Sequence, residues 1–125
     1  MKRELKSIDD IRLLVDSFYS EVSKDEDLNY IFNVIHKVDW VHHLPQMYKF
    51  WSMILFGRTE YNGNPMLKHI LVNKKTPLTT YHFDKWLALW FKTVDTYFIG
   101  ENAMIIKLKA ENMSRGIRKN LSIKF

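Results

Sequence analysis

The stretch TTYHFDKWLALWFKTVDTYFIG, residues 79–100, decides the fold class of this chain. Its apolar residues recur every three or four positions, which is the spacing of one face of an α-helix. That face is heavily aromatic and comprises Phe83, Trp86, Leu87, Trp90, Val94 and Phe98. Thr79 or Thr80 is suited to cap the start of the helix, and Gly100 is suited to end it. The stretch therefore predicts one long helix whose aromatic face is buried against other elements.

The sequence on both sides has the same helical spacing. Ser7, with Asp10 three residues later, predicts the capped start of a first helix whose buried face includes Tyr19. A brief helix is predicted over residues 28–35, a longer one over residues 40–56 and a last one over residues 103–121. Because four Gly and three Pro leave few breaks in 125 residues, we expect an all-α fold in a single domain that spans residues 1–125.

The helix predicted over residues 40–56, WVHHLPQMYKFWSMILF, carries two adjacent histidines and a proline. His43 falls on the apolar stripe four residues before Met47, whereas His42 is rotated by about 100° toward the flank. Pro45 lies inside the pattern, where it lacks the amide hydrogen for a helix hydrogen bond. It predicts a late start of this helix or a kink.

Composition excludes several classes of function. The chain has no cysteine, so disulfides, thiolate metal sites and cysteine nucleophiles are excluded. There is no phosphate-binding glycine loop and no His-Glu-x-x-His pattern. The net charge of +5 comes from 19 basic and 14 acidic residues that are dispersed along the chain, which favours a solvated surface over a nucleic-acid interface. The charged N-terminus and the lack of a long apolar run predict a cytoplasmic protein without membrane spans.

Four polar residues fall on apolar faces of different predicted helices: Tyr19, His43, Trp86 and His69, the last on a very short helix after Pro65. Each has an ordinary structural explanation. Tyr and Trp are readily buried when the O–H or N–H group finds a partner, and a lone inward His is more often a satisfied core residue than a ligand. Spacing alone leaves open both a cofactor pocket and a cofactor-free helical interaction domain.

Several motifs occur in an order that matches a known family. They are W-x-x-H-L followed by F-W, then Y-N-G-x-P with a histidine four residues beyond the proline, then H-F-D-x-W-L. With the surrounding segments DIRLLVDSFY and IFNVIHKVDWVHHLPQMYKFWSMILFG, they cover most of the chain. The sequence resembles the group III truncated haemoglobins. This resemblance implies a two-over-two helical sandwich around one haem b.

The resemblance also implies roles for particular residues. Carried over by position, His69 would be the iron ligand. The family's polar positions on the ligand-binding side fall on Tyr19, His43 and Trp86. Its haem-packing positions fall on Phe32, Met47 and Trp51. Two features depart from the pattern: the loop at residues 70–80 is longer than usual in the family, and the adjacent His42 offers an alternative to His43, although helical phase favours His43.

As a globin of this kind, the protein would bind O₂, NO and CO. Hydrogen bonds from the Tyr19 O–H and the Trp86 N–H would slow the release of O₂, which favours NO dioxygenation or peroxide-linked chemistry over oxygen transport. Either reaction needs an external reductase, because the chain encodes no flavin or nicotinamide domain. The alternatives are an oxygen or NO sensor, a scavenger without turnover, and the cofactor-free interaction domain. We expect a monomer or a weak dimer.

Overall fold

The computed structural model describes residues 2–35, 37–58, 61, 63 and 78–121. The helices in these residues are α1 (Ile8–Lys24), α2 (Glu26–Asn29), α3 (Trp40–Phe56), α5 (Thr80–Tyr97) and α6 (Glu101–Asn120), with a π-helical segment η1 (Tyr30–Ile35) after α2. The described part of the chain contains no strand, although Arg3 and Phe98 form an isolated parallel bridge. The prediction of an all-α fold is therefore confirmed.

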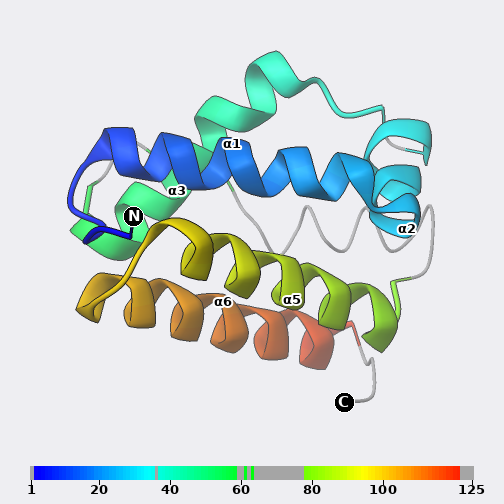
Figure 1. Ribbon diagram of the computed structural model, residues 1–125. Helices are drawn as coiled ribbons and strands as arrows, with labels where there is room; N and C mark the ends of the chain where they lie inside the picture. Colours follow the sequence, from blue (N-terminus) through cyan, green and yellow to red (C-terminus); the bar gives the residue numbers. More distant parts are fainter. Residues whose placement is uncertain (1, 36, 59–60, 62, 64–77, 122–125) are drawn as a thin grey trace.

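The four long helices pack in two layers. Helix α1 packs on α3 and α5, and α6 packs on α5 and α3. Figure 1 shows α5 and α6 side by side in one layer, with α1 and α3 in the other. This arrangement is the predicted two-over-two sandwich, and it leaves room for a cavity where the layers face one another. No helix in the described segments is long and apolar enough to cross a bilayer.

Helix α1 starts where the sequence predicts. The Ser7 hydroxyl accepts a hydrogen bond from the Asp10 N–H at 3.3 Å, and the Asp10 carboxylate accepts one from the Ser7 N–H at 3.2 Å. The Arg3 guanidinium donates to the same carboxylate at 2.6 Å. These bonds satisfy amide groups that an uncapped helix would leave free. They fix the register of α1, which places Phe18 and Tyr19 in the core.

The brief predicted helix has two parts. Asp25 caps α2 by accepting hydrogen bonds from the N–H groups of Asp27 and Leu28, both at 3.1 Å. The chain then widens into η1, which ends before Val38 donates its N–H to the Phe32 carbonyl at 2.9 Å. Leu28 and Ile31, within the range predicted for this helix, are buried. The expected end of this helix near His36 lies outside the described residues.

Helix α3 corrects one prediction. It begins at Trp40, directly after its cap Asp39, and Pro45 lies inside it, so of the two alternatives predicted from Pro45, a late start or a kink, the late start does not occur. Asp39 compensates at the helix start, because its carbonyl accepts the N–H groups of His42 and His43 at 3.1 and 2.8 Å. The carbonyl that Pro45 leaves without its helical partner belongs to Val41, a residue that is 81% exposed and within reach of water.

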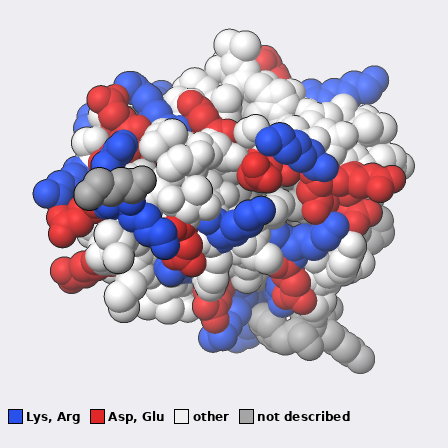
Figure 2. All heavy atoms as spheres, viewed as in Figure 1, with Lys and Arg blue, Asp and Glu red and all other residues white. Residues whose placement is uncertain are grey.

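The last two helices are held together by a buried tryptophan. Thr79 caps α5, and the fully buried Trp90 donates its indole N–H to the Ile106 carbonyl of α6 at 3.3 Å. Ala103 and Ala110 are buried on α6, inside the range predicted for the last helix. Basic and acidic side chains are interspersed on the face shown in Figure 2, in line with the dispersed charge of the sequence.

Candidate functional site

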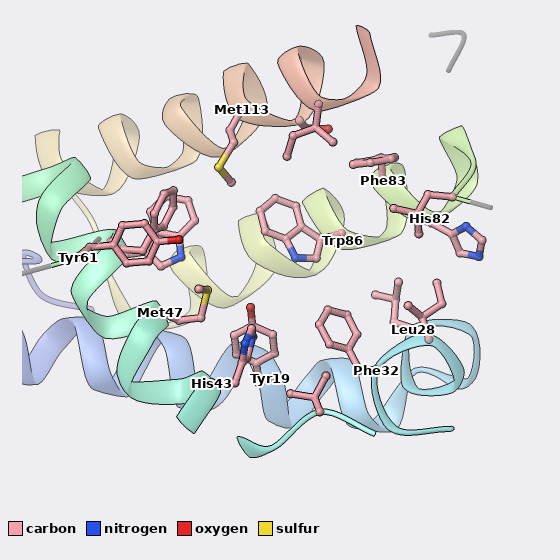
Figure 3. Close-up of a pocket in the computed structure, with 17 residues that line it drawn as sticks. Tyr19, Leu28, Phe32, His43, Met47, Tyr61, His82, Phe83, Trp86 and Met113 are labelled. Atoms are coloured by element: carbon pink, nitrogen blue, oxygen red, sulfur yellow. The ribbon is translucent and has the colours of Figure 1, made fainter. Parts of the chain in front are cut away.

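A cavity of about 300 Å³ lies between the two layers. All four long helices contribute to its wall, together with α2, η1 and the segment around Tyr61. Most of the lining side chains are apolar or aromatic (Figure 3). The volume is at the lower end of the range of about 300–1,000 Å³ that small-molecule and cofactor pockets occupy. The cavity is therefore the principal candidate site in the described part of the protein.

The cavity has a closed end and a more open end. Tyr61 and His82 lie at opposite ends in Figure 3. At the closed end Tyr61 is 8% exposed, and its ring packs on Phe50 with 5.3 Å between centroids. At the open end His82 and Leu78 are only half-buried. The Nδ1 atom of His82 accepts the Thr79 N–H at 3.1 Å, so the Nε2 atom of its neutral ring carries the proton.

Tyr19 provides a buried hydroxyl in the cavity wall. It comes from α1 and is 8% exposed. Its ring packs against Trp40 at 5.1 Å, His43 at 5.2 Å and Phe32 at 5.9 Å between centroids. No described residue forms a hydrogen bond with its hydroxyl. Burial raises the pKa of Tyr19 well above its ordinary value of 10.0, so the hydroxyl stays protonated and can donate a hydrogen bond to a molecule in the cavity.

The two adjacent histidines of α3 occupy different environments. His43 lines the cavity, and its ring lies 5.4 Å from the ring of Trp40. The His42 side chain is 85% exposed, and its Nδ1 atom lies 2.7 Å from the Asp39 carboxylate. The hydrogen bond with His42 lowers the pKa of Asp39 below its ordinary value. The structure therefore places His43 in the cavity and His42 in solvent, as helical phase predicts.

Tryptophans form another part of the wall. Trp86 of α5 and Trp51 of α3 both line the cavity. Trp90 lies behind them and stacks on both, with centroid distances of 6.0 Å to Trp86 and 4.5 Å to Trp51. In Figure 3 the nitrogen of the Trp86 indole is on the ring edge that faces Tyr19 and His43. The Trp86 N–H is thus a second donor directed to the same region as the Tyr19 hydroxyl.

A charged network fixes the open end. Lys85 of α5 contacts the Asp25 carboxylate at 2.9 Å and the Asp27 carboxylate at 3.0 Å. Tyr81 also donates its hydroxyl proton to Asp27 at 2.8 Å. The hydrogen bonds from Tyr81 and Lys85 lower the pKa of Asp27, and those to Tyr81, Asp25 and Asp27 raise the pKa of Lys85. This network holds the first turns of α5 against α2.

The structure brings most of the predicted site residues together. Six of them line the same cavity: Tyr19, Phe32, His43, Met47, Trp51 and Trp86. The predicted iron ligand His69 and its short helix lie outside the described residues. The cavity wall also includes residues that we did not single out from the sequence, namely Tyr61, His82 and Ser114. The sequence could have indicated Tyr61, because it belongs to the Y-N-G motif. No feature of the sequence indicates Ser114, which follows Met113 on α6.

The lining fits a flat conjugated macrocycle such as haem. Aromatic and aliphatic side chains supply the apolar contact that holds such a ring. Two of the lining residues also carry unpaired polar groups, since the hydroxyls of Tyr61 and Ser114 are buried without a hydrogen-bond partner among the described residues. A buried unpaired hydroxyl costs about 1–3 kcal/mol, so a bound molecule that offers these groups a partner is favoured.

Comparisons with known proteins agree with this geometry. A family model for bacterial-like globins matches residues 7–116. A group 3 truncated haemoglobin of Campylobacter jejuni subsp. jejuni is 32% identical over 114 residues, covering 89% of this chain and 87% of that protein. The crystal structure of a group III truncated haemoglobin from Campylobacter jejuni superposes with a TM-score of 0.85 and 31% identity, covering 97% of this chain and 95% of that one.

Proposed function

Because the chain belongs to the bacterial-like globins and, within them, to the group III truncated haemoglobins, we propose that it holds haem b in the cavity described above. We further propose that it binds O₂, NO and CO there for redox chemistry such as NO dioxygenation, rather than for oxygen transport. The observation that carries this proposal is the buried hydroxyl of Tyr19, which points into an apolar cavity and has no partner among the described residues.

The residues that would hold the haem come from several elements. His69 would be the iron ligand, by its position four residues beyond the proline of the Y-N-G-x-P motif. Phe32, Met47 and Trp51 would pack on the macrocycle, because all three line the cavity. The carboxylates of the haem would lie toward the open end near His82, since charged groups remain solvated there. When bound, the haem supplies an iron centre with an open coordination site for a diatomic ligand.

The polar residues of the cavity would set how long a ligand stays. Tyr19 and Trp86 each offer one donor, and a hydrogen bond in such a site contributes about 1 kcal/mol. Two such bonds together would slow dissociation by a factor on the order of ten to thirty. His43 would add a third polar contact beside Tyr19, because the two rings are only 5.2 Å apart. Slow release suits a protein that retains O₂ for reaction, and it disfavours a carrier.

Turnover would need electrons from another protein. We propose an external reductase for this step, with the globin acting as a monomer or a weak dimer. The test is to mix the reduced, oxygen-equilibrated protein with NO and to measure nitrate. Rapid consumption of NO with one nitrate formed per NO supports NO dioxygenation. Sluggish reaction, with ligand binding intact, supports the sensor or scavenger alternative. Failure to bind haem at all supports the cofactor-free interaction domain.

A further inference from the structure

The chain has four tryptophans, and three of them are stacked. Trp90 is 0% exposed. Its ring is parallel to that of Trp86, with an interplanar angle of 0°, and lies at 22° to that of Trp51. The outer two members border the cavity, whereas Trp90 does not. The stack therefore begins at the cavity wall and extends into the protein interior.

The stack also favours a positive charge on its buried member. A cation is attracted to the face of an aromatic ring, and indole is the most effective of the three aromatic side chains. Trp90 has two such neighbours, and it donates its N–H to the Ile106 carbonyl at 3.3 Å. A hydrogen bond to a carbonyl oxygen becomes stronger when the donor is charged. These contacts offset part of the cost of placing a charge away from water.

We propose that Trp51, Trp86 and Trp90 form an internal one-electron donor for reactions of the protein with hydrogen peroxide. This inference depends on the proposed haem function. Reduction of one hydrogen peroxide to two waters takes two electrons and two protons. One electron comes from the haem iron and the other from the stack, the protons come from solvent, and the O–O bond breaks. The stack is left as an indole radical cation and the iron is left one electron more oxidised, and two equivalents of an external one-electron reductant restore both.

Trp40 is the matched control. It is the fourth tryptophan, and it does not line the cavity. Its indole N–H donates to the side chain of Asn33 at 2.7 Å, and its ring stacks on Phe32 at 5.9 Å rather than on another indole. It lies on the same side of the protein as Tyr19, with 5.1 Å between ring centroids. A radical that forms wherever an aromatic ring is near the site would reach Trp40 or Tyr19 as readily as the stack.

The test is a freeze-quench electron paramagnetic resonance experiment on the haem-loaded protein after hydrogen peroxide is added. One sample carries tryptophan with a deuterated indole ring, and another carries deuterated tyrosine. We expect an organic radical whose hyperfine pattern narrows only with the tryptophan label. Trp90→Phe should reduce its yield several-fold, and Trp40→Phe should leave the yield unchanged. Peptide mass spectrometry after repeated peroxide exposure should find oxidised indoles at positions 51, 86 or 90.

Several results would overturn the proposal. One is a signal whose hyperfine pattern narrows only with the tyrosine label. The others are a radical yield that falls as much in Trp40→Phe as in Trp90→Phe, and a radical yield that is unchanged in Trp90→Phe. If Trp90→Phe does not fold, as judged by circular dichroism, Trp51→Phe and Trp86→Phe are used instead, and unchanged yields in both count against it. Absorption spectra recorded first show whether the protein binds haem. A protein that binds haem but lacks the radical refutes the proposed tryptophan electron donor and leaves the proposed haem function intact.

Discussion

The aromatic ring of Tyr19 meets the ring of His43 edge to face, with 5.2 Å between centroids and an interplanar angle of 80°. One residue comes from α1 and the other from α3. Both line the cavity. This contact joins the two helices of one layer at the site, and it places a proton donor and an imidazole side by side in an apolar environment.

Loss of the Tyr19 hydroxyl should speed the release of O₂. In Tyr19→Phe the ring contacts remain but the donor is gone, so the dissociation rate should rise about three- to fivefold. Stopped-flow displacement of O₂ by CO measures this rate. Tyr30→Phe is the control, because Tyr30 is 51% exposed and lies outside the cavity wall. Equal rates in the parent and Tyr19→Phe would exclude the hydroxyl as a donor to the ligand.

Substitution of His43 should affect ligand binding, whereas substitution of His42 should not. His43→Leu changes the lining of the cavity and should alter the CO association rate several-fold, whereas His42→Leu should leave it at the parent value. Flash photolysis of the CO complex gives both rates. If His42→Leu changed the CO association rate strongly and His43→Leu did not, His42 rather than His43 would face the ligand. That result would contradict the exposure of the His42 side chain.

Phe18 should be critical for stability. It is 0% exposed and packs edge-on against Trp86 at 5.6 Å and Trp90 at 4.9 Å. Phe18→Ala should lower the free energy of unfolding by about 3–5 kcal/mol, since it removes a large side chain and leaves a void. Urea denaturation measures the change. The exposed Val41→Ala is the control and should shift stability by no more than about 0.5 kcal/mol.

The network of Lys85, Asp25 and Asp27 at the open end should make the stability of the protein depend on pH in the acidic range. The pKa of Asp27 lies below its ordinary value of 3.8 because of the hydrogen bonds from Tyr81 and Lys85. The contribution of Asp27 to the free energy of unfolding is therefore present above pH 3.8, and it is lost as the pH falls through the lower pKa of the folded state. Lys85→Met should lower the urea midpoint at neutral pH and weaken this loss in acid. Lys24→Met, at an exposed 3.5 Å pair with Glu21, should change neither.

Much of the fold was accessible from local sequence patterns. The Ser7 and Asp10 capping pair and the inward phase of His43 depend on residues within a few positions of one another, and the structure has both. Of the late start and the kink expected at Pro45, the late start does not occur, because the effect of a missing hydrogen bond depends on whether water can reach the freed carbonyl. That exposure is a property of the folded chain.

Other features of the site depend on contacts between distant parts of the chain. Lys85 meets Asp25 across 60 positions, and Trp51 stacks on Trp90 from another helix. No spacing rule pairs such residues. Ser114 was missed for a related reason: its burial follows from how α6 faces the cavity, and a serine adds nothing to an apolar pattern. Sequence periodicity therefore predicts which face of a helix is buried, but not which partner it meets.

The central claim, that haem is held in this cavity by His69, is tested most directly by the absorption spectrum of the reduced protein before and after CO is added, compared between the parent and His69→Ala. If His69 holds haem in this cavity, the parent should give a haem spectrum with a sharp CO-induced Soret shift, and His69→Ala should show weakened haem retention with altered iron coordination. Identical spectra in the two proteins, or no haem complex in the parent, would contradict it.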